Sequence, residues 1–194
     1  YAEAHNNLGL ALQELDQVDA AVESYKKALA VDPDYAEVNY NLGLALQELE
    51  QLDTAVEYYE KAVAIQPDYA EAHNNLGNSF LELGQLDDAV KSYEKAIDTQ
   101  PDYAEAYNNL GSIFMELDQM DDAVKSYEKA LALKPDDADA YNKLGIVYME
   151  LDQTDVALKC YKKALALKPD DAKAHANRGD AMKRLNLWGE AMAS

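Results

Sequence analysis

The sequence predicts an all-α protein, a right-handed α-α superhelix (a solenoid) built from antiparallel helical hairpins. The first observation is a strict internal repeat, because the prolines fall 34 residues apart with nothing inserted between copies. A period of this length is typical of stacked supersecondary units. The second observation is that each copy carries two apolar stripes with the spacing of a helix face. The prolines that mark the period are Pro33, Pro67, Pro101, Pro135 and Pro169.

The first helix of each repeat is predicted from the apolar stripe that follows the proline. Asp102 and Glu105 have the spacing of a capping box. In this motif each of the two side chains accepts a hydrogen bond from the backbone N–H of the other residue at the start of the helix. The stripe itself has residues three and four apart, as one face of a helix requires. In this copy the stripe consists of Tyr107, Leu110, Gly111, Phe114 and Leu117.

The second helix is predicted after a short turn at Asp118. Gly84 and Asn186 hold the same place in other copies, and both tolerate the left-handed backbone that often ends a helix. Asp121 stands just before the second stripe and is expected to cap it. Pro135 ends the helix because proline cannot continue the hydrogen-bond ladder. The second stripe consists of Ala123, Tyr127, Ala130 and Leu131.

A glycine recurs in the middle of each predicted first helix. Gly111 costs roughly 1 kcal/mol there relative to alanine, so its repetition indicates a close approach of the two helices. We expect a small residue to face it, from one of two alanine ladders on the second helix. These are Ala21, Ala55, Ala89, Ala123, Ala157 and Ala191, and Ala28, Ala62, Ala96, Ala130 and Ala164.

The repeat unit resembles the tetratricopeptide repeat. The resemblance rests on the 34-residue hairpin, the Leu-Gly pair in the first helix, the Ala–Tyr–Ala pattern in the second and the closing proline. One departure is the family's large aromatic early in the first helix. That place is held by His5, Asn39, His73, Tyr107, Tyr141 and His175.

The whole chain, residues 1–194, is expected to form a single array of five repeats and a partial sixth. Tyr1 and Ser194 both fall inside a repeat, so we expect a fragment of a longer protein. Residues 172–194 carry four basic and two acidic residues, whereas the body is acidic. The expected repeats are 2–35, 36–69, 70–103, 104–137, 138–171 and 172–194.

Composition excludes several classes of partner. The net charge of −20 and pI near 4.3 argue against binding nucleic acid or an anionic membrane surface, both of which require basic patches. No apolar run approaches the ~20 residues of a membrane span. Cys160 is the only cysteine, which excludes a disulfide framework and is typical of a reducing compartment. We therefore expect a cytoplasmic location.

Amide side chains recur on the first helices, which in tetratricopeptide arrays line the concave groove. Each amide carries a donor and an acceptor, so a regular row of them is able to hold an extended peptide backbone. This row resembles the asparagine ladder of the O-GlcNAc transferase repeat domain, which holds substrate polypeptides in that way. The alternative is that the amides bridge neighbouring helices or face water. The predicted binding residues are Asn7, Asn41, Asn75 and Asn109, with Asn6, Asn74, Asn108, Asn142 and Tyr40 beside them.

A row of glutamates accompanies the amides near the end of each first helix. Negative charge there opposes the helix dipole by about 0.3–1 kcal/mol each. A basic ligand would explain the row, and so would a solvated helix face. Arg184 holds this place in the sixth repeat, and the glutamates are Glu14, Glu48, Glu82, Glu116 and Glu150. Of these, Glu48, Glu82 and Glu116 are predicted to contact the peptide.

Catalytic and metal-binding functions are not indicated. Nothing in the sequence assembles a nucleophile, a base and an oxyanion site. His5, His73 and His175 lie in separate repeats, too far apart to share a metal. We therefore expect no cofactor, no metal and no catalytic residue.

The sequence favours a non-catalytic scaffold that binds an extended polypeptide in the concave groove, with a basic ligand as one interpretation. Two alternatives stay open. The chain could be the substrate-presenting N-terminal arm of a larger enzyme of the glycosyltransferase, sulfotransferase or methyltransferase type. It could also assemble end to end with itself, the acidic first hairpin stacking on the basic sixth of a neighbour.

Overall fold

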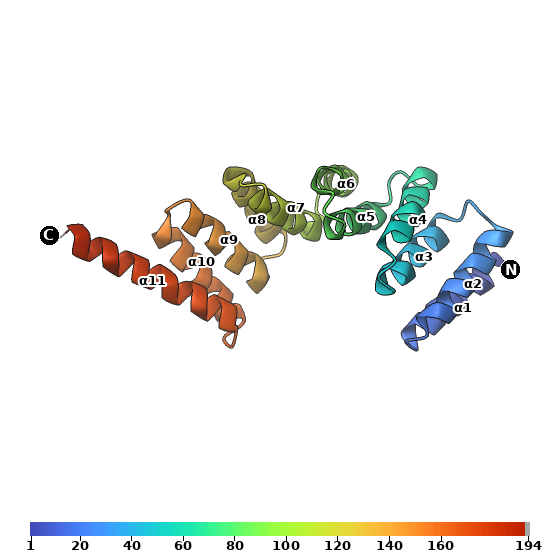
Figure 1. Cartoon of the computed structure of the whole chain (residues 1–194), viewed down its shortest axis with the longest axis horizontal. Helices are drawn as coiled ribbons and strands as arrows, with labels where there is room; N and C mark the ends of the chain where they lie inside the picture. Colours follow the sequence, from blue (N-terminus) through green and yellow to red (C-terminus); the bar gives the residue numbers. More distant parts are fainter. Residues whose placement is uncertain (193–194) are drawn as a thin grey trace. The chain divides into compact units, whose positions relative to one another are not determined.

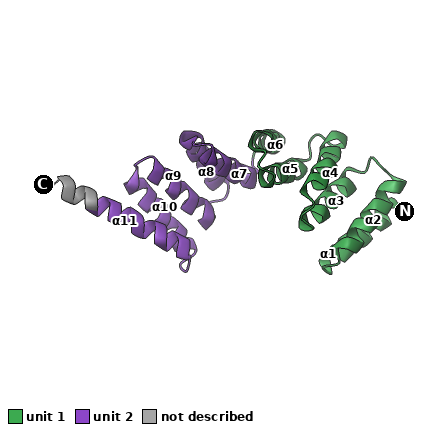
Figure 2. Ribbon diagram, in the orientation of Figure 1, with its two compact units in different colours: residues 1–101 green, residues 102–194 purple. Residues whose placement is uncertain are grey.

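The computed structural model describes the backbone of residues 1–192 and the side chains of residues 1–186. The described residues form eleven helices and no strand, which confirms the all-α helical-repeat fold. Contacts divide the chain into two compact units, Tyr1–Pro101 and Asp102–Ser194 (Figures 1 and 2). The predicted ladder residue Ala191 and the chain end at Ser194 lie outside the described side chains.

The first unit consists of three antiparallel hairpins. Each hairpin packs its two helices together, and within the unit α2 also packs on α3 and α4 on α5. This is the arrangement that lets small hairpins bury a continuous core. The pairs are α1 (Ala2–Glu14) with α2 (Val18–Val31), α3 (Ala36–Glu48) with α4 (Leu52–Ile65), and α5 (Ala70–Glu82) with α6 (Leu86–Thr99).

The second unit contains two hairpins and one further helix. The hairpins repeat the packing of the first unit, and α11 packs on α10 with a smaller contact to α9. Their bounds are α7 (Ala104–Glu116) with α8 (Met120–Leu133), α9 (Ala138–Glu150) with α10 (Thr154–Leu167), and α11 (Ala172–Met192).

The turn inside each hairpin has a left-handed residue where the sequence predicts one. Asp118 has φ 59° and Gly84 has φ 73°. The amides of Asp118 and Gln119 donate to the carbonyls of Met115 and Phe114, which is the Schellman pattern at a helix end. The turn predicted at Asn186 is wrong, because α11 runs through it. Asparagine permits a left-handed backbone without requiring it. A continued helix therefore satisfies the backbone N–H and C=O groups that the expected turn would have paired.

The predicted aspartate caps of the fourth repeat are also wrong. α7 starts one residue later than the box requires, with Tyr103 at the N-cap, and Gln119 holds that place before α8. Within the described chain neither start has a side-chain cap hydrogen bond. An aspartate stands at the N-cap itself only in later repeats. Asp137 accepts from the Ala140 amide at 2.9 Å, and Asp171 from the Ala174 amide at 3.2 Å.

The close approach at the helical glycines is confirmed in the first five repeats, but the residue that faces each glycine is a tyrosine. The expected close approach is wrong for Gly179, where no described atom lies within 4 Å of the Cβ position. A Cβ on Gly77 would lie 2.7 Å from the Tyr93 ring, and a Cβ on Gly111 would lie 2.9 Å from the Tyr127 ring. These rings are fully buried, as are the alanines of the described ladders. A glycine therefore gives a large aromatic side chain the room to lie between the two helices.

We predict that Gly77→Ala lowers the free energy of unfolding by about 1–3 kcal/mol, because the added methyl overlaps the Tyr93 ring. Gly179→Ala is the matched control, since no described atom lies within 4 Å of a Cβ there. The control is expected to be neutral or to gain up to about 1 kcal/mol from helix propensity. Urea unfolding followed by circular dichroism measures both, and equal stability of the two variants would contradict the tight glycine–tyrosine contact.

Candidate functional site

The amide row of the first unit connects the first helices of successive repeats. Asn41 Nδ2 donates to Asn6 Oδ1 at 3.0 Å, across 35 residues of sequence. Asn75 Nδ2 donates to the Tyr40 hydroxyl at 2.9 Å, across the same interval. The amides therefore hold α1 to α3 and α3 to α5, which is the bridging alternative of the sequence interpretation.

The second unit repeats this bridge with variations. Asn177 Nδ2 donates to Asn142 Oδ1 at 3.0 Å. Lys143 takes the place of an amide and donates to Ser112 Oγ at 3.0 Å. Asn108 Nδ2 donates to Asp137 Oδ2 at 3.0 Å, while its buried Oδ1 has no hydrogen-bond partner among the described residues.

Burial separates the predicted binding amides into two groups. Asn6, Asn41, Asn74 and Asn142 are buried, so these side chains lie against neighbouring residues. Asn7 is exposed. The half-buried members are Tyr40, Asn75, Asn108 and Asn109. The peptide-binding role assigned to the row stays a prediction, and Asn7 is its most accessible member.

A second hydrogen-bond chain links the buried tyrosines to the glutamate row, and the sequence interpretation missed it. The Tyr59 hydroxyl donates to Gln47 Oε1 at 2.9 Å, and Gln47 Nε2 donates to Glu82 Oε1 of the next repeat at 3.1 Å. Tyr25 and Gln13 form the same link toward Glu48. The signal in the sequence was the glutamine placed directly before Glu14 and Glu48. The sequence interpretation did not connect this glutamine with the tyrosine twelve positions later, whose hydroxyl it accepts from.

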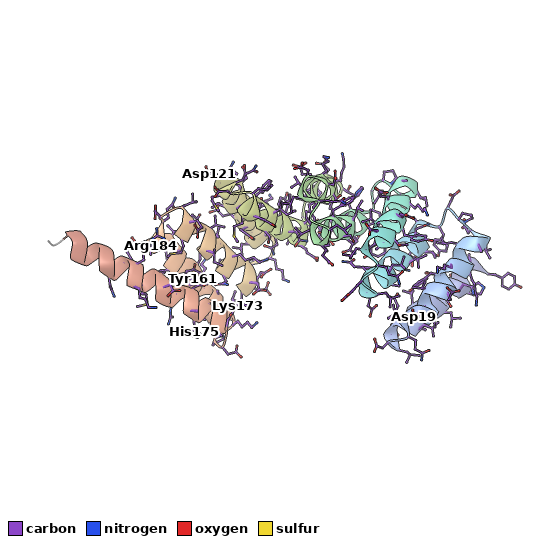
Figure 3. All side chains as sticks on the ribbon, viewed as in Figure 1. Asp19, Asp121, Tyr161, Lys173, His175 and Arg184 are labelled. Atoms are coloured by element: carbon purple, nitrogen blue, oxygen red, sulfur yellow. The ribbon has the colours of Figure 1, made fainter. Side chains whose placement is uncertain are left out.

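The glutamates themselves lie at the surface. Glu48 and Glu82 in the first unit are exposed, and so is Glu116 in the second. Arg184 stands at the equivalent place in α11 and turns back to the preceding repeat (Figure 3). Its Nη1 donates to the Met149 carbonyl at 3.0 Å, and its guanidinium pairs with Asp152. A cation at this point stabilises the negative end of α9.

The histidines of the first helices have a structural role at the proline turns. His73 Nε2 lies 3.0 Å from the Pro67 carbonyl oxygen, and His175 Nε2 lies 2.8 Å from that of Pro169. Asn39 donates to the corresponding Pro33 carbonyl. In the described part of the chain, no three histidine, cysteine, aspartate or glutamate side chains are placed to hold a metal ion. No described helix is long and apolar enough to cross a membrane.

Models of the tetratricopeptide repeat match residues 34–102, 74–141 and 126–159, and a TPR repeat model matches residues 14–50 and 147–186. The chain belongs to the tetratricopeptide repeat (TPR) family. Comparison with curated proteins gave no match. TPR proteins are typically non-catalytic scaffolds, and this fold supports a protein-interaction scaffold here.

Solved TPR structures superpose over nearly the whole chain. MamA gives a TM-score of 0.79 at 30% identity, with 85% of this chain and 96% of MamA covered. A thermophilic TPR protein of Thermus thermophilus gives 0.68 at 26% identity, covering 94% of this chain and 99% of that one. YrrB, a TPR protein with an unusual peptide-binding site, gives 0.77 with 92% of each chain covered. At 24% identity the likeness to YrrB concerns the fold alone.

Burial raises the pKa of the interior tyrosines. It is the main reason that the pKa of Tyr25 rises to about 12, and the negative charge of Glu37 adds to the effect. The pKa of Tyr161 also rises to about 12, again chiefly through burial and then through Cys160 and Asp180. For Tyr127, burial raises the pKa while the hydrogen bond with Ser112 partly offsets it.

Alkaline pH is predicted to unfold the chain. A phenol whose pKa is higher in the folded state stabilises the fold below its unfolded value, and this contribution is lost as pH rises through the folded value. The free energy of unfolding should therefore fall between pH 10.0 and about 12. Urea unfolding at stepped pH measures the loss, and tyrosinate absorbance follows the phenols. Ionisation of all tyrosines in one step near pH 10, in a folded chain, would contradict the prediction.

The tyrosine–glutamine link is tested by copying one repeat into another. In the third repeat Leu81 replaces the glutamine, and Asn78 accepts from the Tyr93 hydroxyl at 2.7 Å. We predict that Gln47→Leu costs about 1–3 kcal/mol of unfolding free energy, because it leaves the buried Tyr59 hydroxyl unpaired. Adding Leu44→Asn, which copies Asn78, should recover part of that loss. A double variant no more stable than Gln47→Leu in urea unfolding would argue against the link.

Proposed function

We propose that the chain is a non-catalytic scaffold that binds extended polypeptide along its first helices, with a preference for basic segments. The observation that carries the proposal is a segregation of charge between the two kinds of helix. The first helices α1, α3, α5 and α7 contain glutamates and no lysine or arginine. The lysines of the first unit all lie on second helices.

Exposure supports this assignment. Glu48 and Glu82 lie at the surface one repeat apart, and each accepts from a glutamine of the preceding repeat that orients its carboxylate. No lysine or arginine side chain of the described first unit pairs with them. A basic side chain of a ligand would therefore meet carboxylates that are already positioned.

The amides contribute backbone recognition in this proposal. Asn7 is exposed and Asn75 is half-buried, so both have side-chain surface that an extended main chain is able to reach. The buried pair of Asn6 and Asn41 holds the helices that carry them. Contact with backbone groups gives affinity with little dependence on the ligand's side chains.

The test compares charge variants on the first helices with charge variants on a second helix. Glu48→Gln/Glu82→Gln removes two charges from the first helices, whereas Glu57→Gln/Glu60→Gln removes two exposed charges from the second helix α4. An array of capped basic, neutral and acidic peptides is probed at low and high salt. We expect the first variant to bind basic peptides about threefold to tenfold more weakly, because each exposed pair is worth about 0.2–1 kcal/mol. The control should bind as the wild type does.

Equal weakening by both variants would overturn the proposal, because it would show only non-specific attraction to an acidic protein. Binding of basic peptides that is unchanged in Glu48→Gln/Glu82→Gln would also overturn it. Asn7→Ala completes the set and should weaken all extended peptides regardless of their charge. Light scattering on the same samples separates peptide binding from end-to-end self-association, which would change the mass of the protein.

A further inference from the structure

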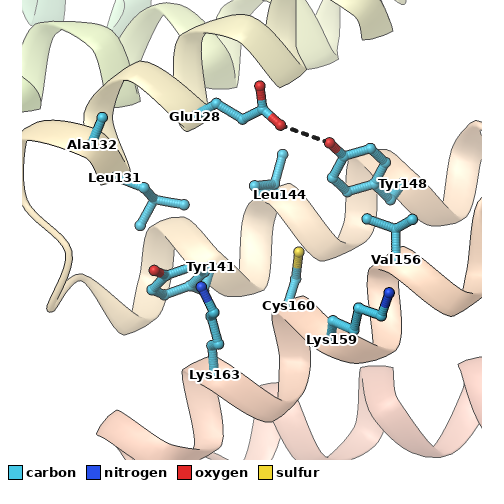
Figure 4. A pocket seen from close by; sticks show the side chains of 10 residues that line it. All are labelled: Glu128, Leu131, Ala132, Tyr141, Leu144, Tyr148, Val156, Lys159, Cys160 and Lys163. Carbon is cyan, nitrogen blue, oxygen red and sulfur yellow. Dashed lines mark hydrogen bonds between the residues drawn. The ribbon is translucent and has the colours of Figure 1, made fainter.

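A pocket of about 390 Å³ opens between α8, α9 and α10 in the second unit (Figure 4). Its floor is apolar and includes Leu131, Leu144 and Val156. The thiol of Cys160 lies within it, and at the rim the Tyr148 hydroxyl donates to Glu128 Oε1 at 2.9 Å. The pocket is lined by residues of α8, α9 and α10, and none of the predicted amide or glutamate residues lines it.

A second hollow of about 170 Å³ adjoins the pocket and shares Tyr141 and Lys163 with it. Pro135 and Leu167 complete this hollow, and Leu167 is exposed. The two hollows therefore follow one another along α10 and form a track with two apolar positions. Such a shape is suited to an extended occupant with two apolar side chains.

The second repeat shows how the equivalent space can be filled. Tyr58 stands in the second repeat at the place of Cys160, and its ring packs against the core with the Lys61 ammonium 4.4 Å from the ring centroid. A cysteine at this place is much smaller than a tyrosine, so the corresponding space in the fifth repeat is left unfilled. Serines hold the place in the first, third and fourth repeats, so a small residue is the rule there and Tyr58 is the exception. In the fourth repeat Ser126 donates to the Asp122 carbonyl.

The charge of the pocket rim also differs from other repeats. Lys91 and Lys125 each pair with an aspartate three residues earlier at 2.8 Å. Val156 replaces that aspartate in α10, so Lys159 has no carboxylate partner among the described residues. Lys163 lies with its ammonium 5.0 Å from the centre of the Tyr141 ring. Figure 4 shows these two lysines on α10, on either side of Cys160.

We propose that this track binds an acidic, apolar peptide segment of a partner protein. Apolar side chains of the segment occupy the two hollows, and its carboxylates pair with Lys159 and Lys163. A partly desolvated charge pair at the edge of an apolar pocket orients the ligand and rejects the opposite charge. The site is independent of the proposed first-helix site and has the opposite charge preference.

Calorimetric titration of the 194-residue chain with a short capped peptide of alternating leucine and glutamate tests the proposal. The control peptide carries glutamine in place of glutamate, because a basic peptide would bind the proposed first-helix site. We expect the acidic peptide to bind at least about tenfold more tightly than this neutral one. Lys159→Glu/Lys163→Glu should weaken it by about tenfold or more. Lys162→Glu/Lys168→Glu makes the same charge change at exposed residues that do not line the pocket, and should leave affinity nearly unchanged.

The repeats supply variants that close the site. Cys160→Tyr copies Tyr58 and fills the pocket, and Val156→Asp copies Asp122 and gives Lys159 an intramolecular partner. Both are expected to lower affinity about tenfold, whereas Cys160→Ser, which copies Ser126, keeps it. Circular dichroism confirms that each variant is folded. If Cys160→Tyr does not fold, the peptide affinity of Val156→Asp tests the proposal.

The single thiol gives an independent readout. Bound peptide should slow alkylation of Cys160 by an uncharged maleimide, because the thiol lies inside the pocket. Unchanged alkylation at saturating peptide would overturn the proposal. So would wild-type affinity in folded Cys160→Tyr or Val156→Asp, equal affinity for the two peptides, or equal losses in the two lysine variants.

Discussion

Each hairpin depends on a buried tyrosine ring that lies against a glycine of the facing helix. The ring fills the space that a Cβ would occupy. A Cβ added to Gly43, for example, would lie only 2.7 Å from the Tyr59 ring. Such a ring buries a large apolar area, but its hydroxyl also needs a partner inside the protein. A glutamine, an asparagine or a serine of the first helix supplies it, at Gln47, Asn78 and Ser112. In the first four repeats, the residues that surround the tyrosine are therefore chosen partly by this one polar atom.

That requirement extends from the core to the surface. Gln47 accepts from a buried hydroxyl and donates to Glu82, so a core constraint fixes the position of an exposed carboxylate in the next repeat. The buried amides also join neighbouring repeats, since the hydrogen bond between Asn41 and Asn6 holds two successive first helices together. Within a unit, the face formed by the first helices is thus ordered by hydrogen bonds that cross repeat boundaries. A regular row of carboxylates is the result, and it needs no ligand to be formed.

The sequence was sufficient for features that a local backbone constraint determines. The proline period, the two helices of each repeat and the left-handed residue at Asp118 are of this kind. It failed where the outcome depends on a one-residue offset, as at Tyr103, which takes the N-cap that Asp102 was expected to hold. It also failed where the partner is distant. The glycine pattern indicated a close approach, but nothing in its spacing along the chain distinguishes Tyr127 from an alanine. The amides were placed on the right helices, but their pairing across 35 residues required the structure.

A repeat protein contains its own comparisons, because equivalent positions share the same backbone and the same neighbours. A difference at such a position is therefore not explained by the requirements of the fold, which other repeats meet with another residue. Cys160 stands where Tyr58 fills the same space, and Val156 stands where Asp122 pairs with a lysine. Cys160 leaves the pocket open, as the serines of the first, third and fourth repeats would, and Val156 leaves the Lys159 ammonium beside it unpaired. The third and fourth repeats pair the equivalent lysine with an aspartate, so an unpaired cation beside an apolar pocket is not required for folding and is the pattern expected of a binding site.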